Sequence, residues 1–115
     1  MSPNASRNAG VFVGKSLVEK RHEAIQDLSD IAIYLAEQSG RDSLAFRFIE
    51  AAESSFGDLA AMPEMGAARE FVDPGLAGVR MWRIAGFDNY RIFYRYSKNT
   101  VEIIRMLHAK REALR

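Results

Sequence analysis

The chain of 115 residues contains no cysteine, which excludes disulfide bonds, thiolate metal sites and a cysteine nucleophile. It has only two histidines, His22 and His108, and they lie far apart in the sequence. We therefore expect no histidine-based metal site and predict that the protein uses no cofactor. The sequence also lacks a glycine-rich phosphate-binding motif and a serine-nucleophile motif.

Long apolar runs and a secretory leader are missing as well. No stretch approaches the ~20 apolar residues that a membrane-spanning helix requires. Residues 1–14 lack the basic-then-apolar order of a secretory signal, and they carry several Gly, Asn and Ser residues. We predict no contact with a membrane, a cytoplasmic location, a flexible N-terminal extension over residues 1–14, and a single domain over residues 15–115.

The formal net charge of +1 conceals an uneven distribution along the chain. Residues 1–78 carry 7 basic and 12 acidic side chains, whereas residues 79–115 carry 9 basic and 3 acidic ones. A basic second half indicates an anionic partner, such as nucleic acid or an acidic protein. The alternative is that the two halves neutralise each other in the folded protein.

Hydrophobic periodicity predicts two helices, over residues 23–38 and from residue 42 or 43 to about residue 62. Gly40 suits a left-handed C-cap, and Asp42 or Ser43 suits the N-cap of the second helix. The short connection predicts an antiparallel helical hairpin. The predicted core positions are Ile25, Leu28, Ile31, Ala32 and Leu35, followed by Leu44, Phe48, Ala51, Ala52, Phe56 and Leu59.

Four strands are predicted around this hairpin. They span residues 16–21, 79–85, 90–96 and 100–107, with turns at residues 86–89 and 97–99. A long loop precedes the last three strands, and its Phe71 and Val72 are expected to pack back onto the core. The order β-α-α-β-β-β predicts a two-layer α+β fold in which the hairpin covers one face of a mainly antiparallel sheet.

The strand over residues 90–96 places Arg91, Phe93 and Arg95 on one face and the even-numbered residues on the other. We predict that the even-numbered residues face the helices. The odd-numbered residues, together with Arg83 of the preceding strand, are predicted to form an open, positively charged face that binds an acidic partner.

Several segments occur in the order found in a known superfamily: EAIQDLSDIAIYLAEQSG, SLAFRFIEAAESSFGDLAAMPEMG with the following Arg69, VRMWRIAGFDNYRIFYRY, and NTVEIIRMLHAKRE. With these segments, residues 20–111 resemble the ParE/RelE toxin superfamily of plasmid stabilisation proteins. The resemblance implies a small cytoplasmic toxin of a type II toxin–antitoxin system, held inactive in a hetero-oligomer with a co-encoded antitoxin.

Two activities occur in that superfamily. RelE-like members cleave mRNA in the ribosomal A site, whereas ParE-like members inhibit DNA gyrase. By resemblance, a RelE-like enzyme would set Arg91 against the scissile phosphate and Arg83 at the position of a strand lysine. His108 or Lys110 would transfer a proton, and Lys110 or Arg111 would match a C-terminal arginine.

The RelE-like set is incomplete in this chain. Ala85 stands where a second lysine is expected, and no tyrosine follows Tyr96. The ending LHAKR is similar to that of ParE-like members. We therefore predict a ParE-like toxin that inhibits DNA gyrase. The alternatives are a ribosome-dependent mRNA endonuclease and an inactive member that only binds its antitoxin.

The resemblance also implies how the antitoxin binds. Antitoxins of this superfamily wrap the toxin with an extended, partly helical tail that folds on binding. An acidic and apolar tail laid over Phe93 would satisfy the charges of Arg83, Arg91 and Arg95. The partner-binding residues and the residues of a nuclease site therefore overlap in this prediction.

Overall fold

The computed structural model describes residues 16–111, without the side chain of Arg111. The predicted extension over residues 1–14 lies outside the described residues. The strands are β1 (Leu17–Lys20), β2 (Ala67–Ala68), β3 (Arg80–Ile84), β4 (Phe87–Ser97) and β5 (Thr100–His108). The helices are α1 (His22–Ser39) and α2 (Asp42–Ala61), with short 3-10 turns η2 (Pro74–Leu76) and η3 (Ala109–Arg111).

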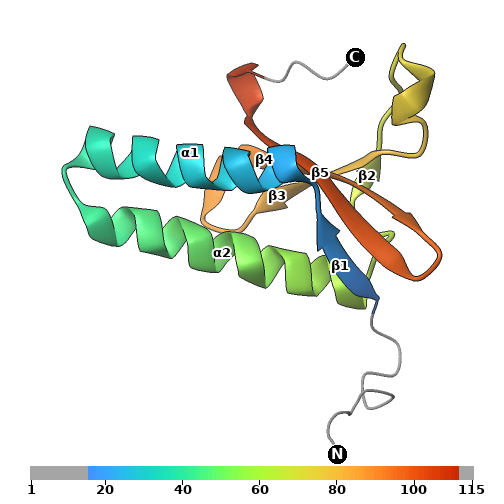
Figure 1. Ribbon diagram of the computed structural model, residues 1–115, viewed down its shortest axis with the longest axis horizontal. Coiled ribbons are helices and arrows are strands. Elements are labelled where there is room, and N and C mark those ends of the chain that lie inside the picture. The colour runs from blue at the N-terminus through green and yellow to red at the C-terminus, as the bar shows by residue number, and fades with distance from the viewer. Residues whose placement is uncertain (1–15, 112–115) are drawn as a thin grey trace, which may run out of the picture.

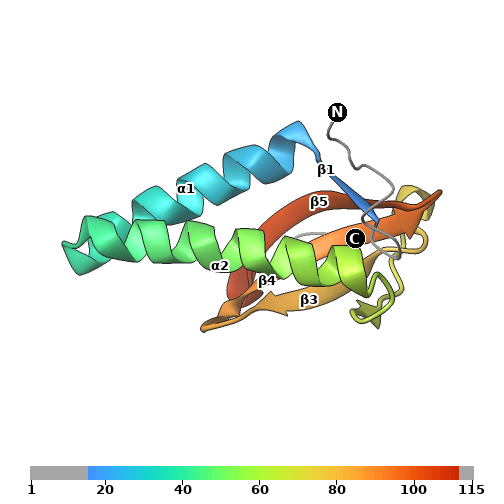
Figure 2. The same ribbon diagram turned by 90° about the horizontal axis from the view of Figure 1, so that it is seen from below.

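The five strands form one sheet in the order β1-β5-β4-β3-β2. β1 pairs with β5 in parallel, and every other pair is antiparallel. The helical hairpin lies on one face of the sheet, and its closed end projects past the strands in both views (Figure 1, Figure 2). The predicted two-layer α+β fold is confirmed, with β4 in the middle of the sheet and the short β2 as an unpredicted edge strand.

The hairpin connection follows from residues 39–42. Gly40 adopts the predicted left-handed conformation with φ 71°, and its N–H donates to the carbonyl of Ala36. The predicted N-cap of the second helix is one or two residues too late, because Arg41 occupies that position and Asp42 is already helical. The Asp42 carboxylate lies in the first turn, where negative charge interacts favourably with the helix dipole.

The main core lies between α2 and the sheet. Phe48 is fully buried and meets the rings of Phe87 and Tyr90 edge-on, at centroid distances of 5.1 Å and 5.4 Å. The other large buried side chains of this core are Phe56, Leu59, Ile84, Ile92, Tyr94, Val101, Ile103 and Met106. The predicted burial of Phe48, Ala52, Phe56, Leu59, Tyr90, Ile92 and Tyr94 is confirmed, whereas Leu44 is only half-buried and Tyr96 is exposed.

Helix α1 contributes less to this core than the periodicity predicts. Only Ala24 and Ala32 are buried on it. Ile25 was a predicted core residue, but 51% of it is exposed. The physical reason is that α1 packs against α2 and β5 near one border of the sheet, so its apolar stripe is only partly covered.

A second, smaller core lies on the sheet face opposite the helices. Val79, Phe93 and Ile104 are buried there, surrounded by Phe71, Leu76, Met81 and Leu107. The loop over residues 69–78 therefore covers part of the face that was predicted to be open. The packing of Phe71 is confirmed, whereas the same prediction for Val72 is wrong, since 90% of it is exposed.

A β-bulge in β5 fixes which residues occupy each face. Phe93 pairs with Arg105 and Tyr94 pairs with Ile103, so Ile104 is an extra residue without a partner on β4. One extra residue reverses the face on which every later side chain of that strand lies. Side chains of β5 beyond the bulge are therefore displaced to the face opposite the one that simple alternation predicts.

Tyr94 fastens the loop that follows α2. Its buried hydroxyl donates to the carbonyl of Pro63 at 2.7 Å and accepts from the N–H of Gly66 at 2.9 Å. A Cβ atom on Gly66 would lie 2.5 Å from the Tyr94 hydroxyl and 2.8 Å from the carbonyl of Met81, so only glycine fits. Burial raises the pKa of Tyr94 above its ordinary value of 10.0, which keeps the hydroxyl protonated.

The two hairpin turns differ in how well the sequence predicted them. Lys98 and Asn99 both have positive φ, as expected for the tight turn between β4 and β5. The turn predicted at residues 86–89 is in fact centred on Ala85 and Gly86, and β4 already begins at Phe87.

Candidate functional site

The sheet face opposite the helices carries several arginines. We use the name arginine face for Arg69, Arg83, Arg91 and Arg95 together with Met81. Arg83 and Arg91 are direct cross-strand partners on β3 and β4, as alternation predicted. Arg83 is exposed, and within residues 16–111 its side chain forms no hydrogen bond or ion pair.

Arg95 serves the fold. Its Nη1 donates to the carbonyls of Gly75 and Ala77, both at 3.0 Å, and its Nη2 lies 3.8 Å from Glu102. Glu102 in turn accepts from Arg21 at 2.7 Å. Arg95 therefore holds the loop over residues 69–78 against the sheet and is less available to a partner than was predicted.

Phe93 was predicted to bind a partner on an open face. The structure instead buries Phe93, so the prediction that it lies on an open surface is wrong. Its exposed fraction is 0%, because the loop over residues 69–78 and Ile104 cover it. Phe93 supports the arginine face from below and does not form part of its surface.

Arg91 makes weaker contacts than Arg95. Its Nη1 donates to the thioether sulfur of Met81 at 3.3 Å, and Arg69 Nη1 donates to the same sulfur at 3.2 Å. Arg91 Nε is shielded from solvent and has no hydrogen-bond partner among residues 16–111. A thioether is a weak acceptor, so the hydrogen-bonding capacity of Arg91 is largely unused.

His108 lies on the other face of the sheet. It pairs with Tyr90, and the two rings are nearly perpendicular at a centroid distance of 5.0 Å. Arg91 pairs instead with Leu107, the neighbour of His108 on β5. Without the bulge at Ile104, alternation would have put His108 on the arginine face. The structure therefore separates the predicted catalytic histidine from Arg83 and Arg91.

The remaining predicted catalytic residues follow His108 in η3. Lys110 is exposed, and its backbone N–H donates to His108 Nδ1 at 3.0 Å. This bond leaves Nε2 to carry the proton of a neutral imidazole. The side chain of Arg111 lies outside the described residues, so its predicted role stays a prediction.

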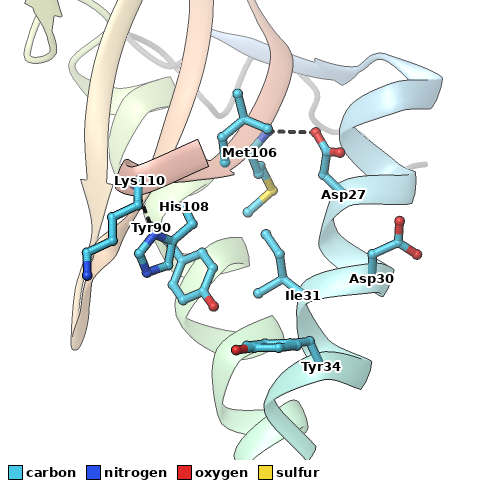
Figure 3. A pocket seen from close by; sticks show the side chains of 9 residues that line it. Asp27, Asp30, Ile31, Tyr34, Tyr90, Met106, His108 and Lys110 are labelled. Atoms are coloured by element: carbon cyan, nitrogen blue, oxygen red, sulfur yellow. Dashed lines mark hydrogen bonds between the residues drawn. The ribbon is translucent and has the colours of Figure 1, made fainter. Parts of the chain in front are cut away.

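A pocket of about 450 Å³ lies beside His108 on the helix side (Figure 3). Helix α1 forms one wall, and the end of β5 with η3 forms the other (Figure 3). Its lining residues are Asp27, Asp30, Ile31, Tyr34, Tyr90, Met106, Leu107, His108 and Lys110. The pocket combines aromatic rings with charged groups of both signs.

Asp27 in this pocket is already engaged by the fold. Only 13% of its side chain is exposed. Its carboxylate accepts from Arg105 Nε at 2.7 Å, from Arg105 Nη2 at 3.0 Å and from the Met106 N–H at 2.9 Å. The Met106 N–H lies past the end of β1 on the border of the sheet, so Asp27 replaces a missing strand partner.

The bond to Asp27 raises the pKa of Arg105, which keeps that arginine charged. The three hydrogen bonds that Asp27 accepts are all used to hold α1 and β5 together.

No three His, Asp or Glu side chains of residues 16–111 are grouped to hold a metal ion. In the same part of the chain, no helix has the length and apolarity needed to cross a membrane.

Two features of the surface were missed at the level of the sequence. An apolar groove of about 580 Å³ follows the outer side of the helical hairpin, where Ile25, Ile33 and Phe46 are exposed. The available signal was that α1 and α2 carry apolar residues at more positions than one buried stripe requires. The contact of two arginines with Met81 had no sequence signal.

Comparison with known proteins gives consistent results. The family profile described as the ParE toxin of the type II toxin–antitoxin system parDE matches residues 18–113. No curated protein matches the chain.

Two solved structures share the fold. The chromosomal ParDE toxin–antitoxin system from P. aeruginosa aligns with a TM-score of 0.66 and 18% identity, over 83% of this chain and 97% of that chain. The RelBE2 toxin–antitoxin complex from Mycobacterium tuberculosis aligns with a TM-score of 0.58 and 24% identity, over 84% of this chain and 93% of that chain.

The family profile covers all described residues except the first two, and the fold agrees with those of the two toxin–antitoxin structures. The chain belongs to the ParE toxin family and is the toxin component of a type II toxin–antitoxin system.

Proposed function

We propose that the protein is a ParE-like toxin that inhibits DNA gyrase and is neutralised by a cognate antitoxin. The observation that carries this proposal is the separation of His108 from Arg83 and Arg91 by the thickness of the sheet. An RNA-cleaving site needs a proton acceptor and a proton donor at the same phosphate. Because of the bulge in β5, His108 lies on the helix side of the sheet, whereas Arg83 and Arg91 lie on the opposite side.

The arginine face is suited to binding and poorly suited to proton transfer. Guanidinium groups remain charged at physiological pH, so they hold anions but do not act as bases. The described neighbours of Arg91 on this face include Met81, Arg83, Phe93, Leu107 and, across the Met81 sulfur, Arg69, and none of these carries a carboxylate or an imidazole. This composition favours recognition of an acidic protein surface.

A supercoiling assay with the purified chain tests the proposal. Gyrase is incubated with relaxed plasmid and ATP, and the toxin is added up to micromolar concentration. We expect loss of supercoiling, and recovery of supercoiling when the antitoxin is added first. Full gyrase activity at micromolar toxin would contradict the proposal.

A ribosome-dependent mRNA endonuclease is the second candidate, favoured by one observation. Arg83 and Arg91 are cross-strand neighbours, and two adjacent guanidinium groups suit a phosphate. In this version Arg91→Ala abolishes translation-dependent mRNA cleavage, and His108→Ala also reduces it. In the gyrase version the wild-type chain cleaves no mRNA.

A third candidate is a member that binds its antitoxin without acting on a target. Inducible expression of the chain alone in bacteria separates this version from the other two. Growth arrest that the antitoxin relieves supports an active toxin. Unimpaired growth at verified expression would favour the binding-only version.

A further inference from the structure

The inference concerns the bonding of Arg91 on the arginine face. Arg91 is partly buried, and the only hydrogen bond of its guanidinium within residues 16–111 goes to the Met81 sulfur at 3.3 Å. Its Nε is shielded from solvent without a partner. A buried donor without an acceptor loses the hydrogen bonds that it would make with water. Arg91 therefore pays an energetic penalty in the free chain.

Two other arginines of the same sheet, Arg80 and Arg105, do have oxygen acceptors for their guanidinium N–H groups. Arg80 donates to the carbonyls of Glu64 and Gly66 at 3.1 Å and 2.8 Å. Arg105 presents its Nε and Nη2 together to the Asp27 carboxylate. In Arg91 the same edge, formed by Nε and Nη2, has no protein acceptor among the described residues.

The edge of a guanidinium that includes Nε matches a planar carboxylate, with two parallel N–H···O bonds. Arg105 and Asp27 demonstrate this geometry within the same protein. Arg83 is the cross-strand partner of Arg91 and is exposed, so it adds positive charge at the surface beside Arg91. Met81 is a flexible side chain that already contacts Arg91, and its movement would open the shielded Nε.

We propose that Arg91 is the anchor for a carboxylate side chain of a protein partner, which docks on its Nε–Nη2 edge as Asp27 docks on Arg105. This inference rests on the proposed function, in which an acidic antitoxin segment covers the arginine face. The positive charge of Arg83 attracts the carboxylate, and the Met81 side chain moves aside when the carboxylate binds. Arg95 and Phe93 take no direct part, because they are committed to the loop over residues 69–78 and to the second core.

A carboxylate of a protein fits this position better than the phosphates of a nucleic acid. Among the described residues, Arg91 contacts Met81 and pairs with Leu107, and Arg69 brings a second guanidinium to the Met81 sulfur. An acidic side chain within an apolar peptide segment would meet both the charged and the apolar groups. A polynucleotide would instead require a row of exposed cations, and of the arginines that β3 and β4 carry on this face only Arg83 is exposed, whereas Arg91 and Arg95 are half-buried.

Nuclear magnetic resonance of arginine Nε–H groups tests the site in the free chain. Sodium acetate and sodium phosphate are titrated separately at constant ionic strength, with sodium chloride as the reference. We expect the Arg91 resonance to shift saturably with acetate, and the Arg105 resonance to stay unchanged because Asp27 fills its edge. An Arg91 shift no larger than that of Arg105 would overturn the proposal. A larger response to phosphate than to acetate would overturn the assignment to a carboxylate.

Antitoxin binding gives the second test. Arg91→Lys keeps the charge but removes the Nε–H and the planar edge, so we expect antitoxin affinity to fall about tenfold or more. Arg47→Lys on the exposed surface of α2 is the matched control and should leave affinity unchanged. Unaltered affinity of Arg91→Lys, with an unchanged unfolding midpoint, would contradict the anchor role.

The two proposals fail in different ways. If the chain inhibits gyrase but Arg91 responds neither to acetate nor in antitoxin binding, only the anchor is wrong. If Arg91 behaves as expected and gyrase is unaffected, the anchor holds and the gyrase target is wrong.

Discussion

Replacing Tyr94 with phenylalanine isolates the hydroxyl that fastens the loop after α2. The ring remains, so no cavity forms, while the bonds to the Pro63 carbonyl and the Gly66 N–H are both lost. Each hydrogen bond contributes about 1 kcal/mol net, and the two stranded backbone groups add a desolvation cost. We expect the free energy of unfolding to fall by about 2–3 kcal/mol.

Urea denaturation at neutral pH measures this loss, and Tyr96→Phe is the matched control on the same strand. Tyr96 is 37% exposed, so removing its hydroxyl should change the stability by no more than about 0.5 kcal/mol. A loss for Tyr94→Phe below about 1 kcal/mol, or equal to that of the control, would refute the reasoning.

Alkaline pH provides an independent check on Tyr94. Burial raises the pKa of the folded Tyr94 above 10.0, so the folded state keeps its proton where the unfolded state loses it. This contribution to stability is fully present below pH 10.0 and disappears as the pH rises through the folded pKa. The stability difference between wild type and Tyr94→Phe should therefore shrink above pH 10.0.

The remaining predictions concern the two helices and the bulge. Phe48→Ala leaves a cavity in the main core and should reduce the free energy of unfolding by ~3–5 kcal/mol in urea denaturation; a loss below ~1 kcal/mol would mean that this core is wrongly assigned. Leu28→Ala, at a partly buried position, should cost clearly less in the same assay, and an equal loss would contradict the partial burial of α1. Asp27→Asn weakens three hydrogen bonds at the bulge and should cost ~2–4 kcal/mol. Faster amide hydrogen exchange at Met106 should accompany it, and unchanged exchange would show that Asp27 does not protect that N–H.

The order of elements and the main core were predictable because their signals are local. Helical spacing located α1 and α2, and alternation in β4 placed Ile92 and Tyr94 toward the helices. The cross-strand pair of Arg83 and Arg91 followed from the same alternation. These patterns need only the neighbouring residues, so a single sequence carries them.

The errors arose where distant segments decide the outcome. The bulge at Ile104 has no local signal, yet it moves His108 away from the arginine face. Phe93 was predicted on an open face because alternation shows on which side of the sheet a side chain lies but not whether a loop covers that side. The role of Asp27 had no local signal either, since only the folded chain brings Arg105 and the Met106 N–H to it.

The central claim is that this toxin acts by binding gyrase and not by cutting RNA. The most direct measurement applies one preparation of the chain to two assays at the same micromolar concentration: gyrase supercoiling of relaxed plasmid, and cleavage of an mRNA under translation. The account predicts inhibited supercoiling and intact mRNA. Unimpaired supercoiling together with mRNA cleavage that Arg91→Ala abolishes would contradict it.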